Sequence, residues 1–163
     1  MKTISYGYGP NNKDGNDYTP VEWIVLEEGN GTLLISRDIL FAAVYDPAEG
    51  TRWEDSALRK YLNGAFLRRF TLDGLLPVGI GPCGRDRVTI LSMRETEQYL
   101  PAETLRACAA APYAQSGAED RCWLRTEVTR RGMQYLCTDG VMLRDDYGFP
   151  AEKAGVRPVI RVK

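Results

Sequence analysis

The chain has 163 residues, a size that suits one domain burying roughly 70% of its unfolded surface. Its 21 Lys and Arg residues nearly balance its 22 Asp and Glu residues, and the net charge of −1 gives no general attraction for nucleic acid or an anionic membrane. The absence of histidine excludes Ser-His and Cys-His nucleophilic pairs and histidine-ligated metals. We expect a single domain over residues 1–163 with no metal and no cofactor.

The four cysteines lie far apart and form no C-x-x-C pair, so a zinc site built from linked cysteines is not expected; they are Cys83, Cys108, Cys122 and Cys137. Two disulfides are an alternative, but the N-terminus lacks the apolar stretch of a secretory signal, which favours free and buried thiols. No apolar run approaches the roughly 18 residues of a membrane span. We therefore expect a cytoplasmic protein without membrane association, or an extracellular one if a leader has been removed.

The first third of the chain predicts strands. Residues 4–9 form a short strand, and the turn-rich residues 11–17 follow. This turn-rich stretch resembles a calcium loop only faintly, because the acidic ligand at the twelfth position is missing. Val21–Glu27 and Thr32–Ser36 are β-rich and flank Asn30-Gly31, a pair that tolerates positive φ and is typical of a hairpin.

The middle of the chain predicts helices. Apolar residues recur every three or four positions over Asp55–Phe70, with Asp55 or Ser56 available as the N-cap. After a loop over residues 74–84, residues 87–91 read as a strand, and Ser92 with Glu95 has the spacing of a capping box. This box begins a helix over Met93–Leu100, and a second short helix covers residues 102–110.

The last third returns to strands. We expect strands over Cys122–Val128, Gln134–Thr138 and Val141–Arg144, with Asp139-Gly140 as a hairpin turn. A final strand covers Val156–Val162. Strands at both ends with helices between them predict an α+β fold.

An ordered set of motifs resembles a known family. The segments are P-V-E-W at Pro20–Trp23, L-L-I-S at Leu33–Ser36, W-E-D-S-A-L-R-K-Y-L-N at Trp53–Asn63, I-L-S at Ile90–Ser92, W-L-R at Trp123–Arg125 and G-V-R-P at Gly155–Pro158. They resemble the bacterial family of uncharacterised domains called DUF6273, and they extend over nearly the whole chain. Cys122 and Tyr61 stand where this family has Trp.

The end of the motif series is similar to the C-type-lectin-like fold, which formylglycine-generating enzymes share. This resemblance implies a twisted antiparallel sheet with two or three flanking helices, paired N- and C-terminal strands, and ligands bound by the loops before the final strand. The chain lacks the close cysteine pair, the histidine ligands and the calcium-binding motifs of the catalytic and calcium-dependent relatives. We therefore expect neither the enzymatic chemistry nor the calcium-dependent sugar binding of these relatives, and an enzyme that uses carboxylates alone stays an alternative.

Several side chains are expected to have structural roles, because they lie on or beside apolar segments; they are Trp23, Trp53, Arg59, Trp123 and Arg157. Arg125 is a candidate ligand-binding residue, although an ion pair or loop tether is the favoured alternative. Among the acids, we expect Glu22 to be an edge carboxylate paired with an arginine and Asp139 to be a turn former. Asp46 is a further candidate for a carboxylate pair, which could hydrolyse glycosides without histidine.

The segment Arg144–Ala154 is the expected recognition surface, because aromatic and charged residues on a loop are typical of binding sites. Its candidate ligand-binding residues are Asp145, Asp146, Tyr147 and Phe149, with Tyr113 in the neighbouring segment Tyr113–Asp120. In an alternative that the sequence leaves open, Tyr147 and Phe149 fold back over the core. For Asp145 and Asp146, a solvated loop is the favoured interpretation. We expect a non-catalytic, C-type-lectin-like binding module for a protein or glycan; the alternatives are a carboxylate-dependent hydrolase and a purely structural scaffold.

Overall fold

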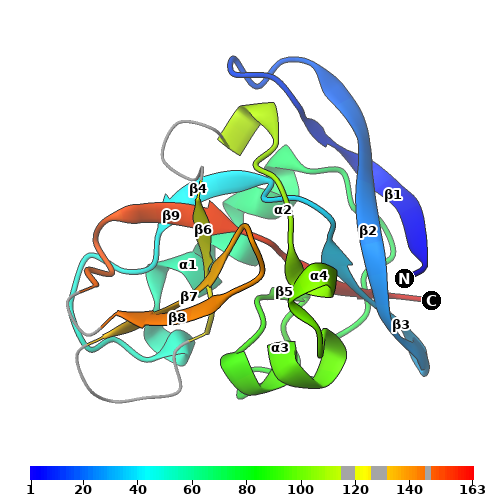
Figure 1. Ribbon diagram of the computed structural model, residues 1–163. Coiled ribbons are helices and arrows are strands. Elements are labelled where there is room, and N and C mark those ends of the chain that lie inside the picture. The colour runs from blue at the N-terminus through cyan, green and yellow to red at the C-terminus, as the bar shows by residue number, and fades with distance from the viewer. Residues whose placement is uncertain (115–119, 126–131, 146–147) are drawn as a thin grey trace.

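The computed structural model describes residues 1–114, 120–125, 132–145 and 148–163, and these form an α+β fold with two five-stranded sheets (Figure 1). The first sheet has the order β1 (Thr3–Pro10), β2 (Tyr18–Gly29), β3 (Gly31–Ser36), β10 (Val159–Val162) and β5 (Val88–Thr89). The second has the order β4 (Phe41–Val44), β9 (Lys153–Val156), β6 (Arg121–Trp123), β7 (Met133–Cys137) and β8 (Met142–Asp145). All neighbours are antiparallel except β6 and β9.

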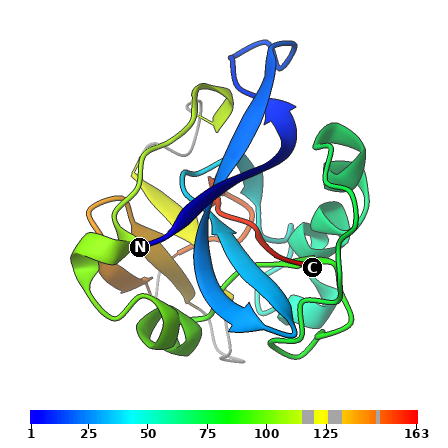
Figure 2. The ribbon, with the colours of Figure 1, turned by 90° about the vertical axis from the view of Figure 1, so that its right-hand side faces the viewer.

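The helices are short and flank the first sheet. They are α1 (Ala57–Leu62), α2 (Ala65–Arg69), α3 (Met93–Tyr99) and α4 (Glu103–Arg106), with 3₁₀ turns at Trp53–Asp55 and Pro112–Ala114. Figure 2 shows α1 and α2 on one side of β1–β3 and α3 and α4 on the other. The main core cluster joins residues of both sheets to α1 and α2, including Trp23, Phe66, Trp123 and Ile160.

Local sequence signals predicted several features correctly. The β2–β3 hairpin turns at Asn30-Gly31, where Gly31 has a φ of 81°. Ser56 is the N-cap of α1, and its hydroxyl accepts a hydrogen bond from the Arg59 N–H at 3.2 Å. Ser92 and Glu95 form the predicted capping box of α3.

The expected pairing of the N- and C-terminal strands is wrong, and so is the single antiparallel sheet. In the first sheet the β2–β3 hairpin lies between β1 and β10, because the long strand β2 pairs with β1 on one edge and with β3 on the other. β10 pairs with β3 and β5 instead.

The expected final strand over residues 156–162 is two strands in different sheets. β9 ends at Val156 and β10 begins at Val159, so the chain changes sheets at Arg157-Pro158. Proline has no N–H to donate to a ladder, which explains the interruption. The Pro158 carbonyl accepts a hydrogen bond from the Ser36 N–H at 3.0 Å.

The two longest predicted helices are shorter in the structure. The helix over 55–70 breaks at Asn63-Gly64, because Gly64 has a non-helical backbone and Asn63 binds another segment, as described below. The helix over 102–110 ends at Arg106, since the Cys108 N–H donates to the Thr138 carbonyl at 3.0 Å instead of continuing the helix. The remaining strands differ by a few residues at their ends, and residues 126–128 lie outside the described residues.

Candidate functional site

Arg59 connects α1 to the loop before β5. Its guanidinium donates to both carboxylate oxygens of Asp86, with Nε–Oδ2 at 2.8 Å and Nη2–Oδ1 at 3.0 Å, and Nη1 donates to the Glu54 carbonyl at 2.8 Å. The hydrogen bond to Asp86 raises the pKa of Arg59 above its ordinary value. With these donors used within the protein, the contacts of Arg59 are those of a structural residue.

Asn63 completes the same network from the C-terminal end of α1. Its Oδ1 accepts hydrogen bonds from the N–H groups of Arg87 and Val88 at 2.9 and 3.1 Å. Its Nδ2 donates to the carbonyls of Val88 and Arg59 at 2.9 and 3.0 Å. Asn63 therefore replaces a missing strand partner for the backbone that leads into β5.

The three tryptophans are buried, with at most 2% of each exposed. The indole N–H of Trp23 donates to the Tyr6 carbonyl, and that of Trp123 donates to the Ala43 carbonyl, both at 2.8 Å. Trp53 packs against Tyr45, with ring centroids 5.8 Å apart. All three rings lie in the core, where a ligand from solvent does not reach them.

Arg125 and Arg157 are buried as well, each with 2% exposed. Arg125 forms an ion pair with Glu95 of the α3 capping box, and its guanidinium lies so close to Gly81 that a Cβ there would collide with it. Arg157 donates to the carbonyls of Ser36 and Arg37 at 3.0 and 3.1 Å. These contacts match the ion-pair and loop-tether alternative for Arg125.

The segment 144–154 is described only in part, because Asp146 and Tyr147 lie outside the described residues. Phe149 is 50% exposed, so it does not fold over the core. The next residue fixes the loop: the Pro150 carbonyl accepts hydrogen bonds from the N–H groups of Tyr45 and Asp46 at 2.8 and 3.1 Å. Asp145 is the last residue of β8, and its Oδ2 lies 3.9 Å from Nη1 of Arg121.

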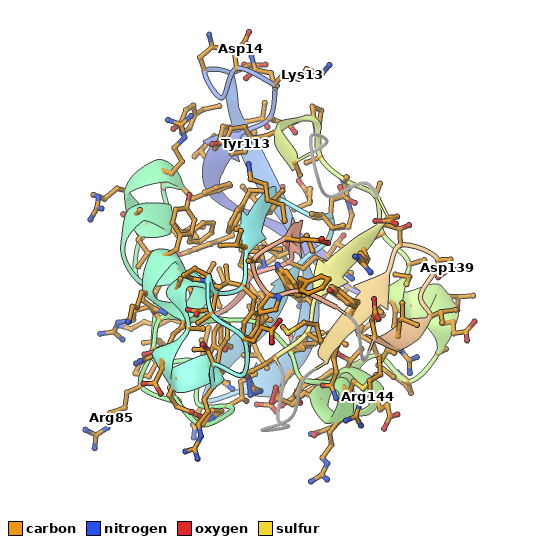
Figure 3. All side chains as sticks on the ribbon, turned by 90° about the vertical axis from the view of Figure 1, so that its left-hand side faces the viewer. Lys13, Asp14, Arg85, Tyr113, Asp139 and Arg144 are labelled. Atoms are coloured by element: carbon orange, nitrogen blue, oxygen red, sulfur yellow. The ribbon has the colours of Figure 1, made fainter. Side chains whose placement is uncertain are left out.

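Tyr113 lies far from that segment. Its ring contacts Arg69, whose guanidinium carbon is 5.5 Å from the ring centroid and whose Nη2 donates to the Gly15 carbonyl at 3.1 Å. Figure 3 shows Tyr113 beside the tip of the β1–β2 hairpin, near Lys13 and Asp14, with Arg144 at the opposite end of the molecule. Among the described candidates, Tyr113 therefore does not share a site with Asp145 and Phe149.

Two of the candidate acids organise backbone turns. Asp139 accepts a hydrogen bond from the Val141 N–H at 3.0 Å, as a turn former does. Asp46 accepts hydrogen bonds at 2.9 Å from the N–H groups of Ala48 and Ala57 and from the Thr51 hydroxyl. Burial raises the pKa of the Asp46 carboxyl, but these hydrogen bonds outweigh it, and the net pKa lies below the ordinary 3.8.

A pocket of about 280 Å³ lies where the turn end of the β1–β2 hairpin meets three other segments. It is lined by Gly9–Asn11, Thr19–Glu22, Arg37, Asp38, Leu40, Phe70 and Ala110–Pro112. Ligand pockets start at about 300 Å³, so the space suits a small molecule or a single side chain. The lining combines polar side chains with the apolar groups of Val21, Leu40 and Phe70.

The two acids that line the pocket differ in their partners. Arg37 and Asp38 pair with each other, with Nη2–Oδ2 at 3.1 Å, and Asp38 also accepts a hydrogen bond from the Ala109 N–H at 3.4 Å. Glu22 accepts a hydrogen bond from the Ser5 hydroxyl, and among the described residues no cation forms an ion pair with it. The arginine partner expected for Glu22 is therefore not found among residues 1–114, 120–125, 132–145 and 148–163.

The sequence did not reveal this pocket, although Glu22 was a candidate acid. Five separate stretches form it, and none of them carries a recognisable motif at the pocket beyond P-V-E-W. The only local signal was Arg37-Asp38 directly after the end of β3, at the point where the chain leaves the sheet.

The cysteines are poor nucleophiles in this fold. All four are free, and burial raises the pKa of each thiol, that of Cys122 to about 12. Because the thiolate is the reactive form, none is activated. Within the described ranges, no group of three metal-ligating side chains that could hold a metal ion occurs. No described helix has the length and apolarity needed to cross a membrane.

The family comparison supports part of the resemblance inferred from the motifs. The family model described as a domain of unknown function (DUF6273) matches residues 29–73. This region contains β3, β4, α1 and α2 and includes Arg59 and Asn63, whereas their partners Asp86, Arg87 and Val88 lie outside it. No curated protein and no solved structure matches the chain.

Proposed function

We propose that the protein is a non-catalytic binding module that holds a small polar ligand, or a polar group of a protein or glycan, in the pocket beside Glu22. The observation that carries this proposal is the pocket itself, whose lining includes Glu22, an acid with no cationic partner among the described residues, together with buried apolar side chains. Pockets of this kind, with a few convergent polar groups, are typical of ligand sites.

Binding is a better explanation than catalysis for three reasons. The chain has no histidine, its thiols have raised pKa values, and Asp38 is already engaged by Arg37 and by the Ala109 amide. A C-type-lectin-like fold and a cytoplasmic location stay predictions; the binding role proposed here agrees with the first and does not depend on the second.

A carboxylate-dependent hydrolase is the second candidate, because Glu22 and Asp38 line the same pocket. Glycosidases need two carboxyl groups that flank the scissile bond. A panel of nitrophenyl glycosides tests this candidate. If the wild type hydrolyses a glycoside and both Glu22→Gln and Asp38→Asn abolish the hydrolysis, the protein is a hydrolase and the binding proposal is wrong. If the wild type hydrolyses none of them, the binding proposal is supported.

The binding proposal is tested by screening a library of small polar fragments with amide NMR spectra. We expect hits that shift the resonances of residues 19–22 and 37–38. Ala111→Phe adds a ring to the lining and should abolish these shifts, whereas Ala107→Phe makes the same change at an exposed position outside the pocket and should preserve them. Hits that map elsewhere, or that survive Ala111→Phe, would contradict the proposal.

A further inference from the structure

The charged residues that line the pocket indicate the charge of its ligand. Two carboxylates and one guanidinium line it, and the guanidinium is already paired with Asp38 through Nε at 3.3 Å and Nη2 at 3.1 Å. Glu22 is left with only a neutral donor, Ser5, among the described residues. A partly buried carboxylate is stabilised by a cation that comes within hydrogen-bond distance.

Part of the lining is a wall of apolar side chains. Val21, Leu40 and Phe70 are at most 8% exposed, so they are held by the core. The Phe70 ring stacks on Phe66 with centroids 4.5 Å apart, and it lies directly against the backbone of Gly9, where a Cβ would collide with it. A hydrocarbon group can contact this wall without displacing any side chain.

We infer that the pocket takes a small organic ammonium ion: a primary amine on a short hydrocarbon stem, with the ammonium group bound by Glu22. This inference rests on the proposed function and names the chemical class of its ligand. The stem contacts Phe70 and Leu40, and the ammonium group donates to the carboxylate oxygens. An anion of the same size is disfavoured by Glu22, and a neutral alcohol gains the apolar contact without the charge-assisted hydrogen bond.

A bare metal ion fits this arrangement less well. Calcium and magnesium take six or more oxygen ligands, and the second carboxylate, Asp38, already interacts with Arg37. The apolar wall supplies no ligand atom to a metal ion, whereas it can bury the methylene groups of an alkylammonium ion and so contribute to binding.

The test compares three isosteric probes on the wild-type protein: n-butylamine hydrochloride, n-butanol and sodium butyrate. Titrations followed by amide NMR spectra should show binding of butylammonium at residues 19–22, at least about tenfold tighter than butanol, since a hydrogen bond to a charged group contributes about 1.5–3 kcal/mol. Butyrate should not bind. A fourth arm, Nα-acetyl-lysine amide, separates a free amine from a lysine side chain as the source of the ammonium group.

Two variants assign the effect to the carboxylate. Glu22→Gln should weaken butylammonium binding about tenfold or more, and Glu28→Gln, which changes an exposed acid on the same strand, should leave it unchanged. The wild-type comparison of amine with alcohol does not depend on either variant folding. Equal binding of butanol and butylammonium in the pocket would overturn the cation inference and leave the proposed function standing. Failure of these probes and of every library fragment to bind there would overturn both.

Discussion

Replacing Asn63 by Ala tests most directly what holds the β5 segment in place, because this one side chain makes four hydrogen bonds to backbone groups. It accepts from the Arg87 and Val88 N–H groups and donates to the Val88 and Arg59 carbonyls, at 2.9 to 3.1 Å. Alanine removes all four at once and adds no bulk.

The expected loss follows from those bonds. Each hydrogen bond contributes about 0.5–1.5 kcal/mol net, which gives about 4 kcal/mol for four. Asn63 is half-buried, so water can reach some of the released groups and reduce the loss. We expect Asn63→Ala to lower the free energy of unfolding by about 2–3 kcal/mol.

Urea denaturation followed by tryptophan fluorescence measures this loss, since the three tryptophans are buried. Arg68→Ala, at an exposed position on α2, is the control and should change the free energy of unfolding by less than about 0.5 kcal/mol. A loss below about 1 kcal/mol in Asn63→Ala would refute the idea that this motif residue holds the β5 segment in place.

Three further predictions concern single side chains. Because the pKa of Asp46 is lowered in the folded protein, its contribution to stability is present above the ordinary value of 3.8 and is lost as pH falls below it; the stability difference between wild type and Asp46→Asn should therefore shrink in acid, and a constant difference would argue against it. Cys122, with a pKa of about 12, should resist iodoacetamide at mildly alkaline pH until urea unfolds the chain, as mass spectrometry can show, and rapid labelling of the native protein would contradict its burial. Phe149→Ala should change the free energy of unfolding by less than about 0.5 kcal/mol, whereas Phe66→Ala should cost about 3–5 kcal/mol, and similar losses in urea denaturation would show that Phe149 packs inward.

The features that the sequence predicted well depend on neighbouring residues. The capping box of Ser92 and Glu95 spans three positions, and Asn30-Gly31 bends a hairpin whose strands are adjacent in the chain. Such interactions are specified by short-range chemistry, so composition and spacing suffice to find them.

The features that the sequence missed depend on distant partners. The helix over 55–70 has a continuous apolar pattern, but Asn63 is drawn to Val88, 25 residues later, and the helix breaks there. The final strand is apolar throughout, yet Arg157 binds carbonyls about 120 residues earlier and Pro158 interrupts the ladder. No periodicity in one segment contains this information.

The pocket escaped prediction for the same reason. In the sequence Glu22 resembles an ordinary surface acid on a strand. Only the fold shows that Arg37, which lines the same pocket, pairs with Asp38 and not with Glu22. The segment predicted as the recognition surface, Arg144–Ala154, does present Phe149 to solvent, but Arg125 and Tyr113 lie elsewhere in the fold.

A crystal structure of the protein soaked in n-butylamine hydrochloride tests the central claim most directly. The account predicts the amine in the pocket, with its nitrogen about 3 Å from a Glu22 carboxylate oxygen and its hydrocarbon stem against Phe70. Amine bound only at other surfaces, with the Glu22 carboxylate contacting nothing but Ser5 and solvent, would contradict it.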